Sequence, residues 1–274
     1  MLKPLLEYFS YDFVRNALIS GSLVGILGAI VGYFVIIRNM SFAAHALAHI
    51  GFSGATGAAL FGISPLNGML MISLLAGIGM GISGKSIPQS DRAIGMVLSI
   101  CLGIGTLFLA FYKGFAGQAP VILFGNIFGV SGPQLIQIIA LAGTAICTLS
   151  IFSRKLLFAS IRPDLAEASG ISLSSLSASF MGVLAVSVTL ASQIVGILLV
   201  FTLIVGPAGI ASRLFHGFWT ANLAGICFAL TAVWCGILMA CLTNWPPSFW
   251  ITTILFILYL ASEIFCRFIL QVDS

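Results

Sequence analysis

Two histidines, His45 and His49, lie four residues apart within an apolar stretch of the chain that carries no other charged side chain. Side chains at this spacing project from one face of a helix, with Cβ atoms about 6 Å apart. Neutral imidazoles so placed bind a borderline divalent cation such as Zn²⁺ and leave coordination positions for other ligands or water. The alternative is that both rings only hydrogen-bond neighbouring helices. Because ionisable groups are costly in lipid and commonly mark a polar route, the pair predicts a site for a metal ion.

The composition around this pair is that of an integral membrane protein. Hydrophobic residues make up 60% of the 274 residues, and charged residues only 7%. Apolar runs of about 20 residues predict membrane-spanning helices. We therefore expect an all-α polytopic bundle of eight or nine spans, forming one transmembrane domain over residues 1–274. The expected spans lie near 14–37, 42–62, 65–84, 93–113, 133–153, 173–191, 194–213, 218–241 and 248–267.

One of these boundaries has to be inferred from length. Residues 173–212 contain no Lys, Arg, Asp or Glu, yet a continuous helix over this stretch and Arg213 would extend about 60 Å, twice the hydrocarbon thickness. The segment must therefore break. Ala191-Ser192-Gln193 is its most polar interruption, and we expect the break there.

The basic residues predict how the bundle is oriented. With the N-terminus outside, eight basic residues fall on the cytoplasmic side and three outside, as the positive-inside rule requires. The cytoplasmic set is Arg38, Lys85, Arg92, Arg154, Lys155, Arg162, Arg213 and Arg267, and the outer set is Lys3, Arg15 and Lys113. Because the basic residues are scattered among loops, the net charge of +4 does not indicate a nucleic-acid partner. The apolar runs predict a multi-pass protein of the plasma membrane.

Small residues mark the expected helix contacts. Gly21, Gly25, Gly28 and Gly32 give GxxxG spacings on the first span, and Gly77, Gly79 and Gly81 crowd the third. Such spacings let helix backbones approach closely in membranes. They predict a closely packed bundle but no particular function.

The cytoplasmic loop near residues 160–171 predicts a short surface helix. Pro163 suits the first helical position, Asp164 and Glu167 lie near the positive end of the helix dipole, and Gly170 suits the stop. Such a helix offers charge and the apolar Leu165 to a partner. An ordinary connecting helix is the alternative, and composition alone does not separate the two.

Two further stretches are unusual for membrane spans. Residues 123–130 are too short to cross a membrane and too apolar to be solvated, which predicts a re-entrant or interfacial segment. The stretch from Gln193 to Gly206-Pro207 predicts a helix interrupted by Gly-Pro. Because broken helices often line transport pathways, Gln193, Gly206 and Pro207 are candidate pathway residues, with a simple proline kink as the alternative.

Taken in order, these stretches resemble the membrane permease subunits of the ABC-3 family, the bacterial importers of zinc, manganese and iron. The resemblance spans nearly the whole chain. Its residues are Arg38 with Ser41-Phe42, Ala46-Leu47 and His49, then Asp91-Arg92-Ala93-Ile94-Gly95, Leu123-Phe124-Gly125-Asn126, Pro163-Asp164-Leu165-Ala166, and Gly196 through Pro207-Ala208.

The resemblance implies a permease subunit of the bacterial inner membrane that pairs with a second copy of itself and is not an enzyme. It implies a cytoplasmic ATPase subunit, an extracytoplasmic metal-binding protein and contact with membrane lipid. No cofactor would be held permanently, and a divalent metal would be the cargo. The residues implied to couple to the ATPase are Arg162, Pro163, Asp164, Leu165 and Glu167.

The chain departs from the family pattern at the candidate metal site. The family's usual pattern is Gly-Asp-Ala-x-x-His; His49 matches its histidine, but His45 stands in the position of the aspartate. A nitrogen donor in place of a hard oxygen predicts preference for Zn²⁺ over Mn²⁺, with manganese or iron as the other possible cargoes. Arg92 also follows Asp91 where the family has Glu-Asp-Thr.

Three other functions are weaker interpretations of the same features. A permease for a metal chelate, such as a siderophore or corrin, would not need histidines in the membrane. An intramembrane metalloenzyme would need an acidic general base beside the pair, whereas the acidic residues fall in loops or at span ends. A proton-coupled carrier would normally show buried carboxylates or an internal repeat, and neither is found in the sequence.

Overall fold

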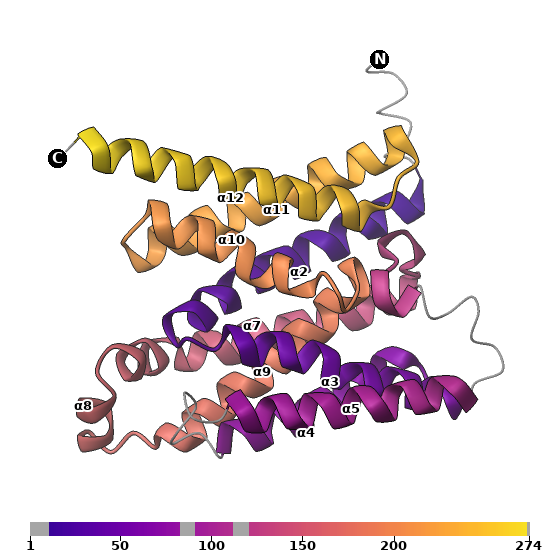
Figure 1. Cartoon of the computed structure of the whole chain (residues 1–274), viewed down its shortest axis with the longest axis horizontal. Coiled ribbons are helices and arrows are strands. Elements are labelled where there is room, and N and C mark those ends of the chain that lie inside the picture. The colour runs from indigo at the N-terminus through magenta and orange to yellow at the C-terminus, as the bar shows by residue number, and fades with distance from the viewer. Residues whose placement is uncertain (1–10, 83–90, 112–120, 273–274) are drawn as a thin grey trace.

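A computed structural model of the chain describes residues 11–82, 91–111 and 121–272, with side chains described to residue 267. These residues form helices joined by short turns, which confirms the all-α fold (Figure 1). The long helices are α2 (Asp12–Ile37), α3 (Ser41–Leu60), α4 (Pro65–Ile82), α5 (Asp91–Phe111), α7 (Gly132–Ile161), α9 (Leu173–Val195), α10 (Val200–Leu214), α11 (Phe218–Thr243) and α12 (Pro247–Val272). The short elements are η2 (Ile127–Gly129) and α8 (Pro163–Ala168).

Seven of the described helices are long and apolar enough to cross a membrane. The shorter apolar helix α10 has 15 residues, and α3 has 20, with its two histidines and several glycines and hydroxyl side chains among the apolar ones. These nine helices correspond in order to the expected spans. The bundle is therefore a multi-pass membrane fold with a span count near the predicted eight or nine.

The break in the long uncharged stretch lies later than expected. Helix α9 continues through Ala191-Ser192-Gln193 to Val195, so the predicted break at those residues is wrong. The Ser192 hydroxyl donates to the Val188 carbonyl oxygen at 2.7 Å, so the helix itself satisfies this polar side chain. The chain instead turns at Gly196, whose φ of 84° favours glycine, and α10 begins at Val200.

Backbone packing holds this break in place. A Cβ on Gly196 would collide with the Leu123 carbonyl oxygen, and a Cβ on Gly125 would lie 2.5 Å from the Gly196 nitrogen. The backbone N–H of Asn126 donates to the backbone carbonyl oxygen of Gln193 at 3.1 Å. Residues 123–130, expected to be re-entrant or interfacial, thus pack against the α9–α10 break, and Ile127 is fully buried.

Most of the predicted glycine contacts are present. On α2, Gly21 and Gly25 face α11, whereas Gly28 and Gly32 face the backbone of α10. On α4, Gly77 and Gly81 pack against α9, but a Cβ on Gly79 would have nothing within 4 Å. The predicted close approach of helices is therefore present at all four glycines of α2 and at two of the three glycines of α4.

The two ends of the bundle differ. Figure 1 shows α8 and the last turns of α12 at one end, and the start of α2 at the other. At the α8 end, Arg213 forms an ion pair with Glu263 and lies 5.0 Å from the Tyr259 ring centroid, which joins the end of α10 to α12. The predicted orientation places this end in the cytoplasm.

Candidate functional site

The histidine pair lies on one face of α3, as its spacing predicts. The two ring centroids are 4.6 Å apart, and the rings are inclined by 74°. The His45 ring also lies perpendicular to the Phe201 ring at the start of α10, with centroids 5.9 Å apart. Both imidazoles are half-buried. The structure therefore brings two potential nitrogen ligands together at a surface that remains partly open.

The pair does not form a complete coordination shell within the described part of one chain. No group of three or more His, Cys, Asp or Glu side chains that could hold a metal occurs among the described residues. Structural zinc sites use four protein ligands, whereas sites with open positions complete the shell with water or another ligand. Two imidazoles suit transient contact with a passing ion better than permanent binding.

Helix α3 is fixed by close backbone contacts with α4. Gly54 and Gly68 meet directly, since a Cβ on either would collide with the carbonyl oxygen of the other. A Cβ on Gly51 would lie 2.6 Å from the Ser73 hydroxyl. This hydroxyl in turn donates to the carbonyl oxygen of Leu47, which lies between the two histidines in the sequence, at 3.4 Å. The histidine face therefore has a well-defined orientation.

Arg38 joins the start of this helix to two distant ones. One guanidinium nitrogen donates to the Ser177 hydroxyl of α9 at 2.7 Å, and another reaches the Ser160 hydroxyl of α7 at 3.5 Å. The guanidinium carbon lies 5.7 Å from the Phe180 ring centroid. Desolvation by burial lowers the pKa of Arg38 from its ordinary value, although an arginine remains protonated. From the sequence, Arg38 is only the edge of a span; its partners lie more than 100 residues away.

The loop helix α8 forms as predicted but is shorter than the expected range of 160–171. Arg162 ends α7 and precedes Pro163, which occupies the first turn of α8 with Asp164. At its end, the Ile171 amide donates to the Ala166 carbonyl oxygen at 3.1 Å, and Gly170 has a φ of 81°. These are the features of a Schellman stop.

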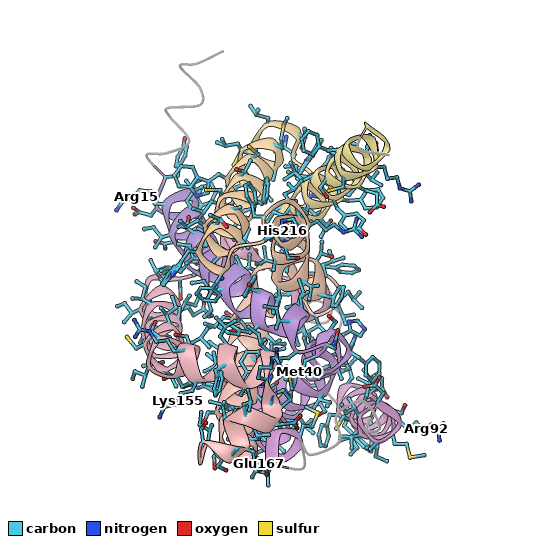
Figure 2. All side chains as sticks on the ribbon, turned by 90° about the vertical axis from the view of Figure 1, so that its left-hand side faces the viewer. Arg15, Met40, Arg92, Lys155, Glu167 and His216 are labelled. Atoms are coloured by element: carbon cyan, nitrogen blue, oxygen red, sulfur yellow. The ribbon has the colours of Figure 1, made fainter. Side chains whose placement is uncertain are left out.

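The side chains of α8 divide into two groups. Ala166 is fully buried, whereas Asp164, Leu165, Glu167 and Arg162 are exposed at the end of the bundle. Figure 2 views this end and shows Glu167 at its margin. An exposed leucine beside carboxylates gives the helix an apolar contact and charge for a partner. Whether these residues couple to an ATPase stays a prediction.

The three candidate pathway residues lie in two different places. Gln193 lines a cavity of about 320 Å³ near the α9–α10 break, together with Asn126, Gln134 and Ala55 of α3. Ala55 is six residues beyond His49, about 9 Å along the helix axis. The cavity therefore adjoins the helix that carries the histidines and offers amide oxygens.

Gly206 and Pro207 belong to helix contacts. Pro207 is buried within α10, which continues through it to Leu214, so the Gly-Pro pair does not interrupt the helix. A Cβ on Gly206 would lie 3.8 Å from Leu255 of α12. The Pro207 carbonyl oxygen faces Gly225 of α11. Their role in a pathway stays a prediction.

Comparison with known proteins relates nearly the whole chain to one family of transport proteins. A family model described as the ABC 3 transport family matches residues 10–266. The manganese import system permease protein ScaB of Streptococcus parasanguinis is 30% identical over 214 residues, covering 78% of this chain and 76% of that protein. A probable iron transport system membrane protein of Haemophilus influenzae is 28% identical over 239 residues, covering 85% and 88%. The solved structure of PsaBC from Streptococcus pneumoniae in complex with Fab has a TM-score of 0.85 and 26% sequence identity, covering 96% of this chain and 95% of that one.

Proposed function

This chain belongs to the ABC 3 transport family, and from that premise we propose that it is the permease of an importer for a divalent transition-metal ion, with Zn²⁺ preferred. The observation that carries the proposal is the pair of imidazoles at 4.6 Å on one face of α3 within a membrane bundle. Ionisable groups in such a position usually contact a polar cargo. Relatives named for manganese and iron transport support a metal ion as that cargo.

The choice of zinc rests on the donor atoms. Imidazole nitrogen suits borderline ions such as Zn²⁺, whereas Mn²⁺ prefers oxygen ligands. Here His45 replaces the family's aspartate, so the pair provides two nitrogens and no anionic oxygen. Half-buried rings on an isolated chain leave room for ligands from a second copy. We propose that the path runs between two copies, with two imidazoles from each.

The driving force would come from other subunits. The sequence has no GxxxxGK[ST] loop, so a separate ATPase would bind nucleotide and dock on α8 through Arg162, Pro163, Asp164, Leu165 and Glu167. A binding protein on the opposite face would deliver the ion. Arg38 contacts Ser160 near the end of α7, which continues into α8, and it precedes α3. Movement of α8 therefore has a direct route to the histidine helix.

A competition assay tests both the transport class and the metal. Cells that lack their own importers would express this chain with its ATPase and binding protein, and uptake of radioactive Zn²⁺ and Mn²⁺ would be measured. We expect Zn²⁺ to be preferred, and we expect His45→Asp to keep uptake while shifting the preference toward Mn²⁺.

The outcomes separate the two parts of the proposal. Better Mn²⁺ uptake by the original chain, unchanged by His45→Asp, would reject the zinc assignment and retain the metal permease. Uptake of a metal chelate without uptake of either free ion would reject the proposed function itself.

A further inference from the structure

A second cavity lies on a side of the bundle that α3 does not reach. It occupies about 470 Å³ between α2, α7 and α11. Its walls are mostly apolar and include Ile30, Leu149 and Leu223, one from each of the three helices. This volume is in the range of ordinary ligand sites. The cavity is thus a groove of ligand size on the lateral surface of a membrane protein.

One end of this groove carries an unpaired cation. Arg154 lines it and has no hydrogen bond or ion pair with any residue that the structure describes. Helix α7 has 30 residues and is about 45 Å long, against about 30 Å of hydrocarbon. Arg154 lies seven residues before its end, about 10 Å along the axis, and so falls near the expected edge of the hydrocarbon. Figure 2 shows the next residue, Lys155, projecting from the side of the bundle opposite Arg92.

A residue of the groove wall also holds a buried hydrogen-bond acceptor without a donor. Asn222 is only 7% exposed and lines the groove. Its amide nitrogen donates to the Phe218 carbonyl oxygen at 2.9 Å, but its Oδ1 has no partner in the described part of the chain. Buried polar atoms are nearly always paired. Because Oδ1 itself has almost no accessible surface here, a ligand in the groove could supply the missing donor once the side chain turns its oxygen toward the groove.

An aromatic residue marks the same level of the membrane. Trp219, in the first turn of α11, lines the groove and is 75% exposed. Tryptophan side chains gather where hydrocarbon meets lipid head groups. Arg154, Asn222 and Trp219 thus place a cation, an acceptor and an interfacial ring together at the head-group end of an apolar groove.

We propose that this groove binds an anionic phospholipid whose head group also carries hydroxyl donors, such as phosphatidylglycerol. Its acyl chain lies along the apolar walls, and its phosphate pairs with Arg154. The Asn222 side chain turns on binding, so that a head-group hydroxyl donates to its Oδ1. Basic pockets between transmembrane helices are known to bind anionic lipid head groups. The proposal is independent of the transported metal, because the groove shares no residue with the histidine pair.

Native mass spectrometry of the purified full chain tests this site with three lipids that have the same acyl chains. Phosphatidylglycerol has charge and hydroxyl donors, phosphatidylmethanol has charge alone, and phosphatidylcholine has neither net charge nor a head-group donor. We expect one saturable site that binds phosphatidylglycerol most tightly, phosphatidylmethanol less tightly and phosphatidylcholine least tightly. Arg154→Gln should weaken phosphatidylglycerol binding roughly fivefold and remove the preference for anionic lipid.

Two further variants make the test specific. Asn222→Leu should remove the preference of phosphatidylglycerol over phosphatidylmethanol but keep the preference of both over phosphatidylcholine. Lys155→Gln is the matched control, since it removes the same charge from the adjacent position outside the groove lining. It should leave all three affinities unchanged.

Two results would overturn the proposal. Equal losses in Arg154→Gln and Lys155→Gln, or no saturable site in the original chain, would show only general attraction of lipid to basic residues. A cross-link between two copies through Leu223→Cys that the parent chain does not form, together with no saturable lipid, would show that a second copy covers the groove.

Discussion

Helix α3 and helix α8 carry the two parts of the proposed transport function, and they are built in opposite ways. In α3, most side chains are buried, and Gly54 meets Gly68 of α4 backbone to backbone. In α8, only Ala166 is buried, and the helix is bounded by its own proline and glycine. The difference indicates that the proposed cargo site depends on tight packing. The exposed side chains of the proposed partner site, in contrast, can be substituted without disturbing the fold. Substitutions in the two helices should therefore fail in different assays.

The largest expected effect is on the packing of α3. In Gly54→Val, the new side chain collides with the Gly68 carbonyl of α4, and neither backbone has room to yield. We expect the free energy of unfolding to fall by about 1–3 kcal/mol. This would be seen as less folded permease in the membrane and a lower thermal midpoint in detergent.

Gly79→Val provides the control on the neighbouring helix. Gly79 has open space around the position of its Cβ, so the same substitution should be tolerated. Similar loss from both variants would show that α3 is not held by the Gly54–Gly68 contact.

The next effect concerns α8 and should leave the fold intact. Changing Asp164 and Leu165 together to Arg reverses a charge and removes the exposed apolar contact. We expect co-purification with the ATPase to fall more than tenfold, while the free energy of unfolding changes by no more than about 0.5 kcal/mol.

His216→Arg is the control for added charge at the same end of the bundle. Figure 2 shows His216 and Glu167 at separate places on this end. The control should retain the ATPase. If the double variant also retained it and transport continued, α8 would be an ordinary connector.

A smaller effect is expected where the two regions meet. Arg38→Lys keeps the charge but cannot span both the Ser177 and Ser160 hydroxyls with a planar fork. We expect transport per ATP hydrolysed to fall several-fold, with ATPase binding unchanged. Ser177→Ala removes one acceptor, at a cost of about 1 kcal/mol, and should have the same effect to a lesser degree. Unchanged coupling in both variants would exclude this link.

The same contrast explains what could be predicted from the sequence. The helices follow from apolar runs and α8 from Pro163 and Gly170, because these signals are local. The predicted break after α9 is misplaced because Ser192 bonds within its own helix, whereas Gly196 turns against Leu123, more than 70 residues away. Contacts of that kind leave no local pattern.

The candidate site is predictable to a similar degree. The spacing of His45 and His49 correctly places both rings on one face of α3. It cannot reveal Phe201 beside His45 or the contacts of Arg38, since these depend on how α3, α7, α9 and α10 pack. Pro207 predicts an interruption, but α10 continues through it to Leu214.

The most direct test of the proposed metal path is radiometal uptake by His49→Ala, measured with the ATPase and binding protein present. The matched control is His216→Ala, since His216 is exposed in the loop before α11 and lies outside the pair. We predict that His49→Ala lowers Zn²⁺ uptake to background with assembly preserved, and that His216→Ala transports normally. Normal uptake by a chain lacking both His45 and His49 would contradict the proposal, because the pair would then be structural.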